Sequence, residues 1–177
     1  FRSNSADRLW LAKTDPQWYG GFQNTLTFKN VSLSVFFEFK HQMGKNYLAT
    51  QGGFFPGQTY FNQPIVVLGR WQQPGDQALI QKFTTVVNTP YLNSLANLGQ
   101  SDAVYSDASY ARCKNVELSF AIPEKWHHSL ALERGRIYVQ AQNVFTITSY
   151  EGADPENQSI YILPPLRTIV AGIQLNF

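Results

Sequence analysis

Two acidic side chains near the end of this 177-residue chain, Asp154 and Glu156, have the spacing and type that could do chemistry. A carboxylate pair hydrolyses a glycosidic bond when the two acids flank the sugar in a cleft and one of them has a raised pKa. Here the acids flank Pro155 in the segment ADPEN, where Asp favours a turn and proline fixes φ. The segment therefore predicts a turn, with a calcium site on Asp154 and Glu156 as a weak alternative.

The three histidines of the chain offer no better catalytic or metal site. His127 and His128 are adjacent and point in different directions in most backbones, while His41 is distant in sequence. Zinc needs three or four converging ligands, and the single cysteine, Cys113, provides neither a cysteine-based zinc site nor an internal disulfide. The sequence contains no phosphate-binding loop, nucleophile elbow or HExxH segment. We therefore expect no enzyme activity and no cofactor.

Aromatic residues form the third group with binding potential, because they make up 15% of the chain. Aromatic rings stack on sugars and anchor protein interfaces, although in long loops they also pack on one another. Several of them lie in segments that we expect to be loops. The candidates for contact with a substrate or an extracellular partner are Trp18, Tyr19, Phe54, Phe55, Tyr60, Trp71 and Tyr105.

The elements that position these residues are five segments in which apolar and polar residues alternate with the period of a β-strand. The segments cover about residues 21–29, 31–42, 108–122, 136–150 and 166–177. Lys29 and Asn30 link the first two as a tight hairpin, since Asn tolerates the positive φ of such turns. In the third segment Arg112 and Lys114 share the parity of the apolar residues. This predicts a bulge near Lys114 or a position at the water-facing rim.

The connections between these segments are short at one end of the array and long at the other. The long ones cover about residues 1–20, 43–107 and 151–165. This asymmetry is typical of outer-membrane β-barrels, in which strands of about 9 to 11 residues cross the bilayer. We therefore expect the long loops to be extracellular and one face of the sheet to line a polar lumen. The residues expected to face the lumen are Glu38, Lys40, Gln140, Gln142 and Thr146.

Five strands do not close an up-and-down barrel, which needs an even number of strands and about 8 in its smallest form. In lipid, an open edge leaves backbone groups unpaired, at a cost of several kcal/mol each. We therefore expect another polypeptide, or sequence upstream of this chain, to complete the wall. The net charge of +2 does not favour nucleic acid as a partner. Two alternatives remain: a soluble extracellular β-sandwich that binds carbohydrate, and part of a multi-chain passive porin.

Several motifs, in order along the chain, resemble the C-terminal end of the SusC/RagA family of TonB-dependent outer-membrane transporters. They are YARCKNVELSFAIPEKW, RIYVQAQNVFTITSYEGADPE and PPLRTIVAGIQLNF, preceded by DPQWYGGFQNTLTFKNVSLSVFFEFKHQMG and RWQQPGD. The resemblance implies an all-β fold in which residues 1–177 supply the last five strands of a barrel of about 22 strands. The N-terminal plug domain of the family is absent from this chain. The resemblance places the protein in the outer membrane of a Gram-negative bacterium, surrounded by lipid.

The same resemblance implies a function and a set of partners. Members of the family import nutrients such as oligosaccharides or peptides, are energised by TonB and work with a SusD-like surface lipoprotein. By resemblance to outer-membrane proteins in general, the alternating apolar residues at the C-terminus form a barrel-assembly signal. These residues are Ile169, Ala171, Ile173, Leu175 and Phe177.

Overall fold

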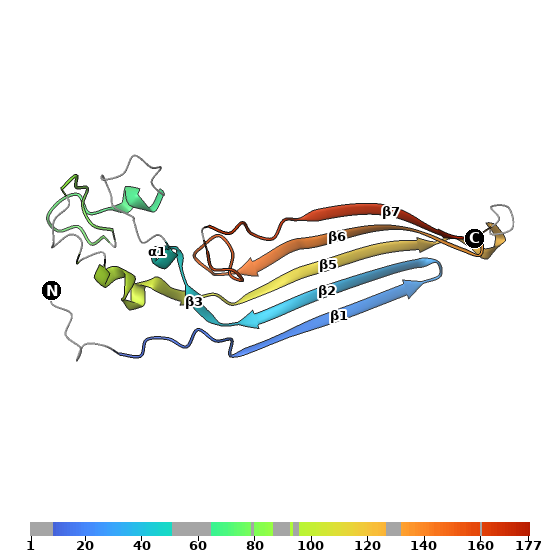
Figure 1. Ribbon diagram of the computed structural model, residues 1–177, viewed down its shortest axis with the longest axis horizontal. Coiled ribbons are helices and arrows are strands. Elements are labelled where there is room, and N and C mark those ends of the chain that lie inside the picture. The colour runs from blue at the N-terminus through green and yellow to red at the C-terminus, as the bar shows by residue number, and fades with distance from the viewer. Residues whose placement is uncertain are drawn as a thin grey trace.

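The protein forms one five-stranded antiparallel sheet, seen in a computed structural model that describes residues 9–50, 65–78, 80–86, 93, 96–126, 132–159 and 161–177 (Figure 1). The strand order is β1-β2-β5-β6-β7, so neighbours along the chain are neighbours in the sheet. The strands are β1 Trp18–Phe28, β2 Val31–His41, β5 Tyr110–Ala121, β6 Arg134–Thr148 and β7 Thr168–Asn176. This architecture confirms the predicted all-β class and fits part of a barrel wall.

The segment between β2 and β5, which the sequence indicated to be a long loop, contains regular structure of its own. A two-stranded sheet pairs β3, Met43–Lys45, with β4, Tyr105–Asp107. Short helices lie in the described part of this segment, among them α1 at Tyr47–Thr50, η2 at Ile65–Gly69 and η3 at Asp102–Val104. A small buried cluster of Leu48, Ile80 and Val104 holds this part together. None of the helices in the described residues has the length and apolar character needed to span a membrane.

The turn between β1 and β2 has two residues, because Phe28 pairs with Val31. The positive φ lies at Lys29, at 54°, and not at Asn30, where we expected it. Asn30 instead ties the turn to β5: its side-chain amide donates to the Ala121 carbonyl at 3.1 Å, and its own carbonyl accepts from the Ala121 N–H at 2.8 Å. In Figure 1 this turn and the C-terminus lie at one end of the sheet, opposite α1 and β3.

A bulge at Lys114 resolves the parity conflict in β5. Phe36 pairs with Asn115 and Phe37 with Cys113, so Lys114 is an extra residue on β5 relative to β2. The register between β5 and β6 shifts at the same level, where Asn143 adopts a φ of 51°. The extra residue reverses the alternation of β5, so that Arg112 lies on the polar face, and the predicted bulge is confirmed.

The two faces of the sheet differ sharply in character. One face is apolar and stays exposed, with Leu26 at 64% and Ile173 at 66% of their full accessible surface. Nothing in the described part of the chain covers these side chains. The opposite face carries the polar and charged side chains. Such an exposed apolar face costs free energy in water, at roughly 25 cal/mol per Å², and is stable where lipid or protein contacts it.

Candidate functional site: the polar face and its ion-pair network

Strand register brings all five lumen-facing candidates onto the polar face. Directly paired residues of antiparallel strands share a face. Glu38 pairs with Arg112, which pairs with Thr146 on its other side, and Lys40 pairs with Tyr110. Further along the same face, Glu117 pairs with Gln140 and Asn115 pairs with Gln142. The sequence-based grouping therefore corresponds to one continuous polar surface across β2, β5 and β6.

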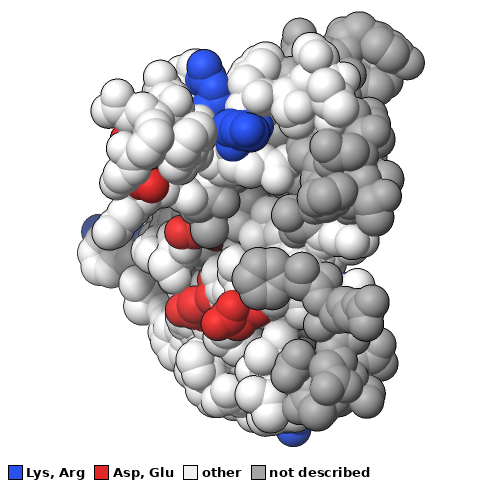
Figure 2. Space-filling view, turned by 90° about the vertical axis from the view of Figure 1, so that its left-hand side faces the viewer, with Lys and Arg blue, Asp and Glu red and all other residues white. Residues whose placement is uncertain are grey.

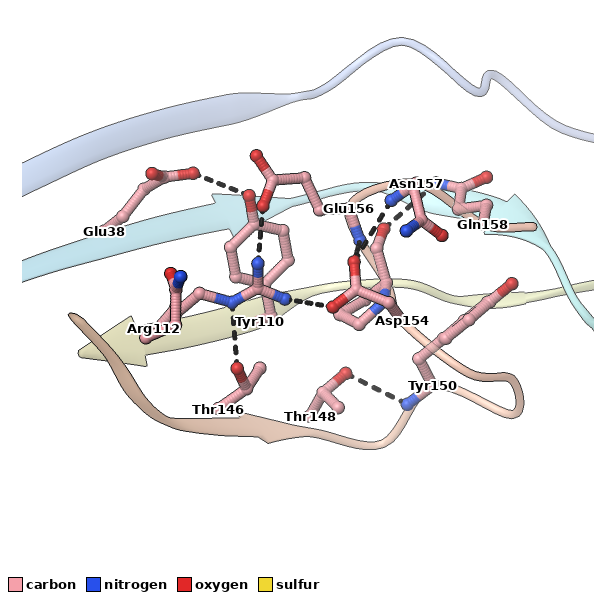
Figure 3. A network of polar contacts seen from close by, with 12 residues as sticks. Glu38, Tyr110, Arg112, Thr146, Thr148, Tyr150, Asp154, Glu156, Asn157 and Gln158 are labelled. Carbon is pink, nitrogen blue, oxygen red and sulfur yellow. Dashed lines mark hydrogen bonds and ion pairs between the residues drawn. The ribbon is translucent and has the colours of Figure 1, made fainter. Parts of the chain in front are cut away.

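Arg112 is the centre of this surface and is only 1% exposed. Its Nε donates to the Thr146 hydroxyl at 2.8 Å, and its Nη1 donates to Glu156 Oε2 at 2.5 Å. Its Nη2 forms a buried ion pair with Asp154 (Figure 3). The guanidinium carbon also lies 5.1 Å from the centre of the Tyr110 ring. The guanidinium group is therefore enclosed by two carboxylates, a hydroxyl and an aromatic face.

Lys114 and Glu38 extend the network towards β2. Lys114 Nζ lies 3.3 Å from Glu38 Oε2 and 3.2 Å from Glu156 Oε2. The Tyr110 hydroxyl donates to Glu38 Oε1 at 2.6 Å. The network thus pairs three carboxylates with two cations, at the place where the bulge directs Lys114 towards the polar side. Breaking a buried ion pair on one side costs about 3–5 kcal/mol, because it leaves an uncompensated charge.

The segment around Asp154 is a turn, as its sequence predicts. Asp154 Oδ1 accepts from the backbone N–H of Glu156 at 3.0 Å and of Asn157 at 3.2 Å. The Asp154 carbonyl accepts from the N–H of Gln158 at 2.9 Å. Arg112 and Lys114 pair with the two carboxylates, and a calcium site on Asp154 and Glu156 stays an untested prediction. In the part of the chain that the structure describes, no cluster of three or more His, Cys, Asp or Glu side chains is arranged to hold a metal ion.

The aromatic candidates separate once the strands are placed. Trp18 and Tyr19 lie within β1 and not in a loop before it. Trp18 stacks on His41 with ring centres 5.5 Å apart, whereas Tyr19, 78% exposed, pairs with Lys40 on the polar face. Tyr105 begins β4 and packs against the buried cluster of Leu48, Ile80 and Val104.

The remaining aromatic candidates give less information. The backbone N–H of Trp71 donates to the carbonyl of Ile80 at 2.9 Å, and Ile80 belongs to the buried cluster with Leu48 and Val104. Phe54, Phe55 and Tyr60 lie outside the described residues.

Seen from the loop end, the described surface is mostly uncharged, with small separate groups of acidic and basic side chains (Figure 2).

The residues of the predicted assembly signal lie along β7 and just after it. Ile169, Ala171 and Ile173 pair with Ala141, Val139 and Ile137 on the apolar face. Leu175 pairs with Gly135 on the same face, and Phe177, 80% exposed, follows the strand. The structure places these side chains on the face that is open to the surroundings; their role in assembly stays a prediction.

Asp107 is among the titratable groups at the loop end whose pKa is shifted. Hydrogen bonds from the Ser109 hydroxyl and the Ser109 backbone N–H lower the pKa of Asp107 below its ordinary value. The N–H donates to Asp107 Oδ1 at 2.8 Å. The Ser109 hydroxyl also lies 2.7 Å from His41 Nδ1, so this group links β2 to the start of β5.

Comparisons with known proteins agree with this geometry. No protein-family profile matches the chain. The chain is 27% identical to TonB-dependent receptor P3 of Formosa agariphila over 98% of its own length, which is 18% of that receptor. It is 33% identical to TonB-dependent receptor SusC of Bacteroides thetaiotaomicron over 44% of its length, or 8% of SusC.

Solved structures give the same result for the fold. The chain superimposes on the RagAB peptide importer in its open-open state with a TM-score of 0.71 at 23% identity, covering 94% of this chain and 18% of that one. The closed-closed state gives a TM-score of 0.67 at 24% identity, covering 90% of this chain and 17% of that one.

The chain is similar to part of the SusC/RagA-family TonB-dependent transporters.

This segment spans about a fifth of the length of the receptor and the importer that it matches over most of its own length, 18% in each case. Sequence reasoning identified the polar face of the segment but did not assign Arg112 and Tyr110 to it. The parity conflict at Arg112 and Lys114 was the signal that pointed there, because a charged pair in the apolar register predicts either a bulge or a position at the rim.

Proposed function

We propose that this segment forms part of the wall and surface loops of an outer-membrane active importer of nutrients. The observation that carries the proposal is a single sheet with one exposed apolar face and one polar face whose charges pair with each other. That combination suits a barrel wall between lipid and a hydrated or plugged lumen. The names of the relatives, TonB-dependent receptors and a peptide importer, support the same assignment.

The complete importer in this proposal has parts that other sequence provides. A plug domain and about seventeen further strands, by subtraction from a barrel of about 22, complete the lumen. TonB supplies the energy, and a SusD-like lipoprotein covers the extracellular mouth formed by the long loops. The imported nutrients are oligosaccharides or peptides. Within this chain Tyr19 best fits contact with such a substrate, because it is 78% exposed on the polar face.

The soluble β-sandwich alternative finds no support in the described residues. A sandwich buries the apolar face of one sheet against a second sheet about 10 Å away. Here the apolar face keeps Leu26 at 64% and Ile169 at 69% exposure. The two-stranded sheet of β3 and β4 belongs to the loop end of the molecule and does not cover this face.

A cysteine-accessibility experiment tests the two faces. Val139 and Gln140 are neighbours on β6 and lie on opposite faces, so Val139→Cys and Gln140→Cys form a matched pair in a Cys113→Ser background. The full-length protein in outer membranes is treated with a small water-soluble maleimide that can enter the lumen. This reagent should modify Gln140→Cys and leave Val139→Cys unmodified. Equal modification of both would contradict a lipid-facing apolar side.

A transport experiment tests the activity. Cells that carry the full-length gene or a deletion of it receive labelled peptide and labelled oligosaccharide mixtures, with and without a protonophore. We expect uptake of one class to require both the gene and the proton gradient. Uptake that needs the gene but survives the protonophore would instead favour the passive porin. Tyr19→Ala should reduce uptake without lowering the amount of protein in the outer membrane.

A further inference from the structure

The loop between β6 and β7 does not project freely from the sheet. Its first part, residues 150–158, folds back over the polar face, so that Asp154 is only 4% exposed and covers Arg112. Figure 3 shows Asp154 and Glu156 pointing towards the Arg112 guanidinium from this segment, while Tyr150 points away from it. The same segment has a second set of partners on its other side.

That second set belongs to residues 42–47, more than a hundred positions earlier in the chain. Gln42 is only 5% exposed, and its side-chain amide donates to the Pro155 carbonyl at 3.0 Å. The Tyr150 hydroxyl donates to the Lys45 carbonyl at 2.6 Å. The Lys45 N–H donates to Gln158 Oε1 at 3.2 Å.

Two further features make the contact between the segments close. The Tyr47 N–H donates to the Glu151 carbonyl at 3.0 Å, a bond between the backbones of the two segments. At Gly44, an added Cβ would lie 2.5 Å from the Gln158 side chain. The two segments therefore contact each other through backbone groups as well as side chains. A rearrangement of either segment would break hydrogen bonds between them.

We propose that Arg112 is a positioning residue that locks residues 42–47 and 150–158 into one rigid unit folded over the polar face. The physical reason is that the ion pairs with Asp154 and Glu156 hold the middle of 150–158 against β5, while the hydrogen bonds above tie it to 42–47. Two loops from different hairpins then move together or not at all. The unit follows from contacts within the chain and does not depend on the proposed transport function.

Hydrogen exchange on the full-length protein in lipid nanodiscs tests this unit, with Arg112→Met as the first variant. The variant leaves Asp154 buried without its cation, which releases the segment from β5. We expect backbone amides in both 42–47 and 150–158 to exchange at least about tenfold faster, which corresponds to a 1.4 kcal/mol loss of protection. The matched control is Arg136→Met, because Arg136 also lies on the polar face but pairs with Glu117 and Gln174.

The outcomes separate clearly. Faster exchange in both segments with Arg112→Met, and in neither with Arg136→Met, supports the unit. Faster exchange in 150–158 alone overturns it, because the two loops are then independent, and unchanged exchange in both overturns the role of Arg112. If Arg112→Met does not reach the membrane, Arg112→Lys replaces it. Lysine keeps the positive charge but cannot bind Asp154 and Glu156 through two separate guanidinium nitrogens, and hydrogen exchange in both segments is measured in the same way. Because hydrogen exchange and not transport is measured, a result that contradicts the rigid unit does not contradict the proposed importer, and the reverse also holds.

Discussion

Phe37 and Phe145 meet edge to face, with ring centres 6.1 Å apart, on the apolar side of the sheet. Cys113 lies between them, because it pairs with Phe37 on β2 and with Phe145 on β6. Its exposure is only 1%, although the surrounding face is open. The aromatic pair thus covers the sheet beside the bulge at Lys114. The bulge interrupts the regular pairing of backbone groups, and in the proposed barrel wall the two rings shield those groups from lipid.

Removing one ring of this pair should uncover the cysteine. We expect Phe145→Ala to increase the rate at which N-ethylmaleimide modifies Cys113 in the membrane-embedded full-length protein. An aromatic pair contributes about 0.5–1.5 kcal/mol beyond area burial, so the increase should be up to about tenfold. Mass spectrometry of the labelled protein measures the rate. Ile147→Ala is the control, since Ile147 lies on the same strand and face at 66% exposure. Equal effects of the two variants would show that the ring pair does not cover Cys113.

The two residues of the first turn should respond to glycine in opposite directions. Lys29 has a φ of 54°, a conformation that costs a non-glycine residue about 1–2 kcal/mol, so Lys29→Gly should raise the unfolding temperature. Asn30→Gly should lower it, because the hydrogen bond to the Ala121 carbonyl is lost at a cost of about 1 kcal/mol. The temperature at which the folded protein changes its mobility on an unboiled gel measures both. A shift of the same sign in both variants would contradict this account of the turn.

A side chain at Gly44 should conflict with Gln158. The Cβ of Gly44→Ala would lie 2.5 Å from the end of the Gln158 side chain, which then moves and loses its bond to the Lys45 N–H. We expect Gly44→Ala to lower the free energy of unfolding by about 1 kcal/mol. In a Gln158→Ala background the same change should be nearly neutral, because the space is free. Denaturant unfolding of the four proteins in detergent measures the coupling. Additive effects would mean that the two residues do not compete for this space.

The charge on Asp107 should stabilise the fold only above the acid range. Its pKa lies below the ordinary value of 3.8 because the Ser109 hydroxyl and N–H bind the carboxylate. A lowered folded-state pKa stabilises the fold above the unfolded pKa, and this stabilisation is lost as the pH falls through the folded value. Asp107→Asn should therefore unfold at a lower temperature than the natural protein at pH 7, with a difference that shrinks below about pH 4. Thermal unfolding in detergent across this range measures it, and a constant difference would contradict the charge effect.

The sequence alone predicted the five strands of the main sheet, their pairing order and the two faces of that sheet. Alternation is a local signal: along β7, Ile169, Ala171 and Ile173 define one face without reference to any other strand. Short turns such as Lys29-Asn30 then force neighbours in sequence to pair in space. Strand length and the asymmetry of the loops follow from the same local pattern, which is why the barrel-wall interpretation needed no structure.

Only the tertiary structure decided where the charges go. The sequence predicted a turn at Asp154 and Glu156 but not their partner, because Arg112 lies on another strand, 42 residues from Asp154. Whether Arg112 faces the polar or the apolar side depends on a bulge, and a bulge is a property of hydrogen bonding between strands rather than of one strand's sequence. The contact between residues 42–47 and 150–158 likewise has no local signature. Long-range ion pairs and strand register depend on contacts and hydrogen bonds between strands, and these form only in the folded chain.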